Sequence, residues 1–262
     1  MIQFQPKNKY GLLVAGRNLY TGFAAVPSFP RWHPLISGNL PLYDWELLMT
    51  GTIDLGERSP LNVINPRISN SKMTLSPELI HTTIHDTLEE EIELYNKGVN
   101  LNGGYKEVAK IWPGTLQVLP EFKDAVKRFS SLSNSDTLTT VIIFSHGENG
   151  SIQMGDSWLS YQSLLKELDS IAGKKAVFMY ACHSGSFQNG LEVHPEREDY
   201  ATITSCKTDE VSTTWNEQEL DNILFEHFRQ KGKYSDLQLK PISKSGDIQH
   251  PQLLGYVDVQ LI

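Results

Sequence analysis

Short apolar runs that end in small or polar residues are the clearest pattern in the chain. They occupy residues 10–16, 137–144, 176–181 and 199–205, and a shorter one lies near the end at 254–259. Aliphatic and β-branched residues dominate them, and runs of this length bounded by turn-forming residues are typical of buried β-strands. The pattern therefore predicts a strand at each of these positions.

Apolar residues at helical spacing fill several of the segments between these runs. Side chains recur three and four residues apart, which predicts a helix in each such segment. The segments are 77–94, 120–131, 164–172 and 220–228. Ser160 is suited to cap the third of these helices, and Gly173 is suited to end it.

Three stretches are rich in proline, glycine, asparagine or serine, which predicts long loops. These stretches are 19–44, 51–77 and 96–118. Within the last of them we expect a short helix at 105–111, whereas residues 43–49 fit either a strand or a short helix. Because the sequence contains no internal repeat, we expect a single domain over residues 1–262 that carries these loops.

The second half of the chain alternates between strand and helix, which indicates an α/β fold. A strand, a crossover helix and a parallel strand form a right-handed unit, and residues 137–181 fit that order. Both strands then end at one edge of the sheet, where open α/β sheets place their sites. His146 and Cys182 each follow such a strand end, so we expect them to be neighbours in space.

Composition limits the expected partners and compartment. The 262 residues carry a formal net charge of -8, which argues against nucleic acid and anionic membranes as partners, because both require a positive surface. No apolar run is long enough for a transmembrane helix, and no apolar segment follows the basic N-terminal residues as in a signal peptide. With only two cysteines, the chain is no disulfide scaffold, and we expect a cytoplasmic protein.

A thiol beside an imidazole can act as a nucleophile. A free cysteine has a pKa of about 8.5, so a neighbouring histidine that takes its proton activates it at neutral pH. We therefore interpret Cys182 as a candidate nucleophile, His146 as its base, and the N–H groups of Gly147 and Cys182 as an oxyanion hole. The simpler interpretation is a small buried cysteine and a structural histidine, but the shared edge and the glycines beside both residues favour catalysis.

The residues around these two positions resemble a known family of peptidases. Ile-Ile-Phe-Ser-His-Gly at 142–147 and Val-Phe-Met-Tyr-Ala-Cys-His-Ser-Gly-Ser at 177–186 are similar to the two motifs of the caspase–haemoglobinase superfamily of cysteine peptidases. Tyr-Ala-Thr at 200–202 and Val-Ala-Gly-Arg-Asn at 14–18 resemble segments of its legumain-like branch.

The resemblance implies a caspase-like, three-layer α/β/α sandwich with a mostly parallel central sheet. It implies a catalytic dyad of His146 and Cys182, an oxyanion hole that includes the Gly147 N–H, and an Asn18 that orients the histidine. The expected activity is that of a cysteine endopeptidase whose partner is a protein or peptide substrate, with no cofactor and no metal ion. A caspase-like protein that binds partners without cleaving them is the alternative, and the sequence identifies no regulatory partner.

Specificity would depend on the pocket for the P1 residue, which precedes the cleaved bond. Legumains carry a Glu two positions before the cysteine, where this chain has Tyr180. The pocket candidates are Arg31, His33, Ser205, Asp209 and Glu210. Their segments contain few large apolar side chains, so we predict a polar or charged P1 residue. The two acids favour Lys or Arg unless they are ordinary solvated loop residues, whereas the arginine combined with an acid would favour Asn.

Overall fold

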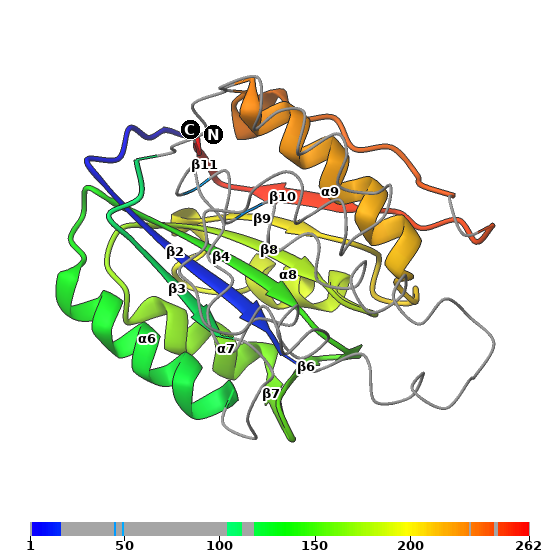
Figure 1. Cartoon of the computed structure of the whole chain (residues 1–262), viewed down its shortest axis with the longest axis horizontal. Helices are drawn as coiled ribbons and strands as arrows, with labels where there is room; N and C mark the ends of the chain where they lie inside the picture. The colour runs from blue at the N-terminus through cyan, green and yellow to red at the C-terminus, as the bar shows by residue number, and fades with distance from the viewer. Residues whose placement is uncertain are drawn as a thin grey trace, which may run out of the picture.

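A six-stranded sheet forms the centre of the protein (Figure 1). The computed structural model describes residues 2–16, 45, 49, 104–111, 118–230, 232–243 and 246–261. The strand order in the central sheet is β10-β9-β8-β4-β2-β3. All neighbouring strands are parallel except β10, which runs antiparallel to β9.

The labels of Figure 1 follow the chain. The strands are β1 (Ile2–Gln3), β2 (Asn8–Ala15), β3 (Glu107–Ile111), β4 (Thr137–Phe144), β5 (Gly147–Glu148), β6 (Ser151–Met154), β7 (Ser157–Ser160), β8 (Lys174–Tyr180), β9 (Tyr200–Thr204), β10 (Gln252–Gly255) and β11 (Val257–Asp258). The α-helices are α6 (Val118–Leu132), α7 (Tyr161–Asp169), α8 (Gly185–Glu192) and α9 (Thr214–Arg229), and Arg197–Asp199 and Tyr234–Asp236 form 3-10 turns.

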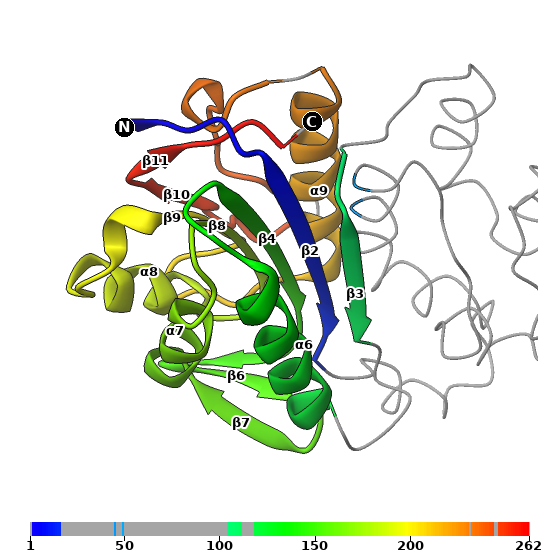
Figure 2. The same cartoon turned by 90° about the vertical axis from the view of Figure 1, so that its left-hand side faces the viewer.

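Helices cover both faces of the central sheet, which gives the protein three layers (Figure 2). The first face buries alternate strand residues against α6, α7 and α8, through Val141, Ile143, Val177, Phe122, Leu165 and Phe187. The opposite face buries the intervening residues against α9, through Leu13, Ile142, Phe178, Leu220, Leu224 and Phe228. Burial on both faces explains why these strands consist mainly of apolar and β-branched residues. The expected α/β/α sandwich with a mostly parallel sheet is therefore confirmed.

Most of the predicted elements are present within the described residues. The long apolar runs became β2, β4, β8 and β9, and the helical patterns after residue 118 became α6, α7 and α9. Ser160 caps α7, because its hydroxyl accepts a hydrogen bond from the Ser163 N–H. The run at 254–259 is divided between β10 and β11. Trp45 and Met49 are helical and buried, and the other residues of 43–49 lie outside the described residues. The predicted helix at 77–94 and the loops at 19–44 and 51–77 lie outside the described residues.

The expected short helix at 105–111 is wrong, because this segment forms the edge strand β3. It pairs in parallel with β2, from Tyr10 opposite Glu107 to Val14 opposite Ile111. Val108 packs toward the α9 side of the sheet, whereas Ala109 and Ile111 pack toward the α6 side. This alternation has the period of two residues that a strand requires, which outweighs any helical spacing in so short a segment.

Helix α8 and the small antiparallel sheet β5-β6-β7 have no equivalent in the sequence-based prediction. The small sheet directly follows β4, and α8 directly follows the turn after β8. Two glycines in the eight residues of α8 weaken its sequence signal. Phe187 and Leu191, which are buried against the α7 side of the core, hold the helix through tertiary packing.

Candidate active site

The adjacent carboxyl ends of β4 and β8 bring the two motif segments together. Phe144 is the register partner of Tyr180, and the Ser145 N–H extends this ladder by donating to the Tyr180 carbonyl at 3.0 Å. His146 follows β4 by two residues, and Cys182 follows β8 by two residues, so both candidates lie just beyond these adjacent strand ends. The parallel arrangement expected from the strand–helix–strand pattern therefore exists at this edge.

Gly147 packs directly against the backbone of the cysteine turn. A Cβ atom at this position would collide with the Cys182 carbonyl oxygen and lie 3.0 Å from the Ala181 Cβ. Only glycine therefore allows the segment after His146 to approach so closely. The next turn is also attached, because the Gly150 N–H donates to the Ser186 hydroxyl of α8 at 3.1 Å.

The thiol of Cys182 is half-buried and hydrogen-bonded to the backbone. It donates to the Ser212 carbonyl oxygen at 3.5 Å, in the segment between β9 and α9. Burial raises the pKa of the Cys182 thiol above its usual range. At neutral pH the sulfur is therefore a thiol and needs a base to become a nucleophile. His146, the candidate base two residues after β4, is exposed.

Three of the pocket candidates lie in or next to the segment after β9. Ser205 is buried, and its hydroxyl donates to the Ala181 carbonyl at 3.2 Å and accepts from the Ala181 N–H at 3.1 Å. Asp209 is exposed. Arg31, His33 and Asn18 lie outside the described residues. Of the predicted residues, the structure thus brings Ser205 next to the residue that precedes the cysteine.

Glu210 is part of a network that anchors this segment. Burial opposes ionisation, but backbone N–H groups of His250 and Lys207 donate to the carboxylate and lower its pKa below the usual range. The donor–acceptor distances are 2.9 Å and 3.2 Å. The His250 ring also pairs with this carboxylate. The carboxylate is therefore directed toward residues 207 and 250.

Two buried acids of α9 were missed by the sequence-based prediction. Glu217 is hydrogen-bonded to the hydroxyls of Ser205 and Ser212, and burial raises its pKa to about 8. Asp221 accepts a hydrogen bond of 2.8 Å from the Tyr180 hydroxyl. The two acids are four residues apart, so they lie on one helix face. Asp221 falls within the helix predicted at 220–228, among its apolar positions, which was the available signal for it, whereas Glu217 precedes that segment.

Tyr180, two residues before Cys182, joins a buried chain of hydrogen bonds. The Trp45 indole N–H donates to the Tyr180 hydroxyl at 3.2 Å, and this hydroxyl donates to Asp221. Burial raises the pKa of the phenol well above its usual range, so it stays neutral. The Asp221 carboxyl group of α9 therefore lies close to the residues that precede Cys182.

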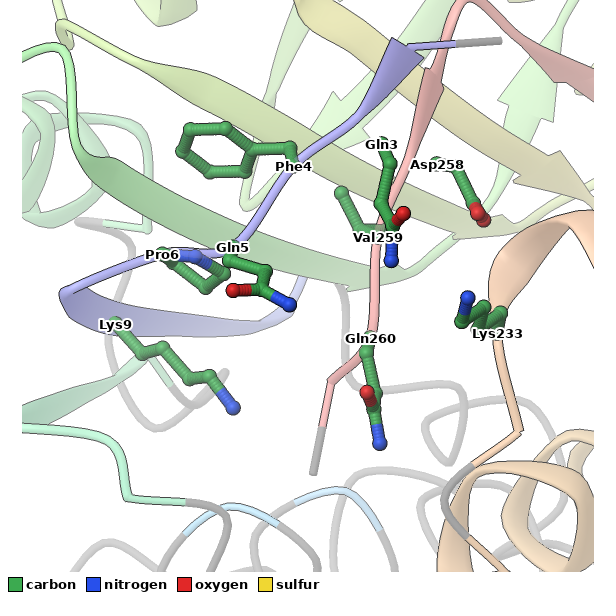
Figure 3. Close-up of a pocket in the computed structure, with 9 residues that line it drawn as sticks. All are labelled: Gln3, Phe4, Gln5, Pro6, Lys9, Lys233, Asp258, Val259 and Gln260. Atoms are coloured by element: carbon green, nitrogen blue, oxygen red, sulfur yellow. The ribbon is translucent and has the colours of Figure 1, made fainter.

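A separate cavity of about 170 Å³ lies at the amino-terminal end of the sheet (Figure 3). Its lining residues are Gln3, Phe4, Gln5, Pro6, Lys9, Lys233, Asp258, Val259 and Gln260. The Lys9 ammonium group donates to the Leu261 carbonyl at 2.8 Å, and the Asp258 carboxylate accepts from the Ser235 N–H at 3.0 Å. Because Lys9 is near the start of β2, this cavity is at the opposite edge from Cys182 and has no thiol or imidazole in its lining.

In the part of the chain that the structure describes, no group of three or more His, Cys, Asp or Glu side chains is arranged to hold a metal ion. Among the described helices, none combines the length and apolar character needed to cross a lipid bilayer.

Comparison with known proteins gives a family match and a structural similarity. Residues 106–201 match a family described as a domain of unknown function (DUF4347). Among solved structures, the chain is similar to caspase-1 from Spodoptera frugiperda, with 12% identity over 98% of this chain and 91% of that chain and a TM-score of 0.47. No curated protein sequence matches the chain. Neither similarity identifies a reaction, so the chemistry of the site has to support any functional conclusion.

Proposed function

We propose that the protein is a cysteine endopeptidase in which Cys182 is the nucleophile and His146 is the base. The observation that carries this proposal is the close packing of the 146–147 segment on the Cys182 turn, at the edge where β4 and β8 both end. A half-buried thiol with a raised pKa needs a nearby proton acceptor, and His146, which follows the neighbouring strand end, is the proposed acceptor.

The proposed reaction uses these groups in two steps. His146 takes the thiol proton while the Cys182 sulfur attacks the carbonyl carbon of the substrate, and N–H groups of Gly147 and Cys182 stabilise the oxyanion. The imidazolium then protonates the departing amine. Water hydrolyses the resulting thioester with the same imidazole as base, which restores the thiol. Asn18 is the proposed residue that orients the imidazole.

We propose a polar or charged P1 residue for this peptidase, with a preference for Lys or Arg. Ser205, Asp209, Glu210, Arg31 and His33 remain the candidates from the sequence. The carboxyl group of Asp221 supports the preference for a basic residue, because it reaches the Tyr180 hydroxyl two residues before Cys182. A buried cation needs such an acid, since an unpaired one would cost several kcal/mol.

A scan of fluorogenic peptides tests both the activity and the preference. Peptides identical except for Arg, Lys, Asn, Asp or Leu at P1 should be cleaved fastest after Arg or Lys. A preference for Leu would overturn the polar pocket. A preference for Asp would mean that a basic residue such as Arg31 dominates it.

A caspase-like scaffold that does not cleave its partner is the alternative function. The observation that favours it is the raised pKa of Cys182, since a resting thiol is a weak nucleophile. Alkylation by iodoacetamide separates the two functions, with Cys206 as an internal control because it is fully buried. The peptidase requires Cys182 to react far faster than Cys206. Equally slow alkylation of both thiols would support the scaffold.

A further inference from the structure

The residue after the proposed nucleophile has an unusual backbone conformation. His183 has a φ of 57°, and among the described residues it is the only non-glycine residue with a positive φ. Side chains with a Cβ atom adopt this left-handed region at a cost, and such residues persist where surrounding contacts hold them. The contacts of His183 therefore indicate what the unusual turn accomplishes.

His183 contacts the segment after β9 through both its backbone and its ring. Its backbone N–H donates to the Glu210 carbonyl at 2.9 Å. Its ring nitrogen Nδ1 lies 2.9 Å from the Thr208 carbonyl oxygen and donates to it, because a carbonyl can only accept. These two bonds attach the cysteine turn to the segment whose Ser212 carbonyl accepts from the thiol.

The carbonyl group of His183 connects the same turn to the segment that follows His146. The Ser186 hydroxyl donates to the His183 carbonyl oxygen at 2.7 Å and accepts from the Gly150 N–H at 3.1 Å. The Ser186 N–H donates to this carbonyl as well, at 3.0 Å. His183 therefore has hydrogen bonds that lead to both sides of the proposed active site.

We propose that His183 is a positioning residue for catalysis, which fixes the Cys182 turn relative to His146 on one side and to residues 208–212 on the other. This inference rests on the proposed function. A thiol and its base must meet within hydrogen-bond distance, and a displacement of about 1 Å can cost about 100-fold in rate. The left-handed conformation of His183 turns the chain sharply after Cys182. The hydrogen bond from the His183 ring to the Thr208 carbonyl stabilises this turn and so fixes the position of the sulfur.

Two substitutions at this position separate the ring contact from the backbone conformation. In His183→Ala the ring bond to Thr208 is lost and the left-handed conformation is disfavoured. In His183→Asn both are retained, because asparagine tolerates this conformation and its Nδ2 is the same number of bonds from the backbone as the histidine Nδ1. Asn189→Ala is the matched control. It removes another bond to Thr208, from the Asn189 side-chain amide to the threonine hydroxyl at 3.0 Å, without touching the cysteine turn.

The primary measurement is the pH profile of Cys182 alkylation by iodoacetamide, since it reports on the thiol and its base without requiring a substrate. His183→Ala should shift this profile and lower kcat roughly 10- to 100-fold with KM nearly unchanged. His183→Asn should restore both to within about threefold, and Asn189→Ala should match the wild type. Thermal unfolding of each variant is measured alongside.

Several outcomes would overturn the inference. It fails if His183→Ala lowers the melting temperature but keeps the wild-type profile and kcat, because the role is then structural. It also fails if the alanine and asparagine variants are equally impaired, because the ring bond is then irrelevant. Turnover that persists in Cys182→Ala would instead overturn the proposed function. The alkylation series would then still show whether His183 controls the reactivity of the Cys182 thiol, because it measures the sulfur directly.

Discussion

The two edges of the central sheet hold similar chemical groups in different ways. At the amino edge, the Asp169 carboxylate accepts from the His194 ring at 2.9 Å and from the Tyr200 hydroxyl at 2.7 Å. Lys174 forms an ion pair of 2.6 Å with Asp199 nearby. The charged groups of this edge are thus directed at one another.

At the carboxyl edge, most of these groups are held by neutral partners. Backbone carbonyls accept from the thiol of Cys182 and from the ring of His183, and serine hydroxyls bind the buried carboxyl group of Glu217. The pair of Glu210 and His250 is an exception and anchors the neighbouring segment. Groups held by neutral partners can gain or lose a proton without breaking an ion pair. The amino edge is therefore suited to stability and the carboxyl edge to proton transfer.

The largest expected difference between the edges is in turnover. Cys182→Ala should lower kcat/KM by at least about 10⁴-fold, because the nucleophile is removed, and His146→Ala should cause a comparable loss. His194→Ala is the matched control at the amino edge. Turnover per folded molecule should be unchanged in this variant, as measured with the best fluorogenic peptide. Substantial turnover in Cys182→Ala would place the nucleophile elsewhere.

The buried carboxyl group of Glu217 should make stability depend on pH. Its pKa is about 8 in the folded protein and near the ordinary value of 4.5 in the unfolded chain. As pH rises between these values, the unfolded chain loses a proton that the folded protein keeps, so the free energy of unfolding falls. The total loss is on the order of 5 kcal/mol.

Glu217→Gln removes this ionisation and should reduce the fall in the free energy of unfolding as pH rises. Urea unfolding of both proteins at pH 5 and pH 8 measures it, and the difference between the two proteins isolates Glu217 from other titrating groups. The variant should gain most at pH 8. If the wild type and the variant change in parallel with pH, the carboxyl group of Glu217 is not the source of the dependence.

At the carboxyl edge of the sheet, the sequence predicted the arrangement of the strands better than the hydrogen-bond partners of the polar side chains. Apolar runs and helical spacing predict β4, α7 and β8, and parallel order then puts the two strand ends that His146 and Cys182 follow at one edge. The partners of Glu217 could not be predicted in this way, because they depend on how α9 packs against the 205–212 segment. Long-range hydrogen bonds between side chains leave no periodic signal in the sequence.

The specificity candidates illustrate the same limit. Glu210 and Asp209 are adjacent in the sequence and equally acidic, yet one carboxylate is anchored by His250 and the other is exposed. Only the fold separates them, since residue 250 is distant in the chain. The helix prediction for 105–111 was wrong for a related reason, because pairing with β2 determines the conformation of this segment.

A smaller effect is expected from the carboxylate at the amino edge. Asp169→Ala leaves the Tyr200 hydroxyl and the His194 ring without their acceptor, which should cost about 2 kcal/mol in the free energy of unfolding. Denaturant unfolding measures the loss, and kcat of the folded protein should remain that of the wild type. A parallel fall in kcat would show that the two edges are coupled, contrary to the comparison.

The smallest effect is expected from a surface ion pair near the start of the sheet. Arg128 of α6 lies 2.9 Å from Glu107 of β3, and the arginine side chain is 64% exposed. Solvent and salt screen such a pair, and ordering two long side chains opposes it, so Arg128→Ala should cost less than about 1 kcal/mol. A double-mutant cycle with Glu107→Ala, measured by urea unfolding at low and high salt, isolates the pair from the packing of each side chain. If the coupling energy between Arg128 and Glu107 is as large as the loss in Asp169→Ala, the solvent exposure of a charged contact at this edge does not determine its strength.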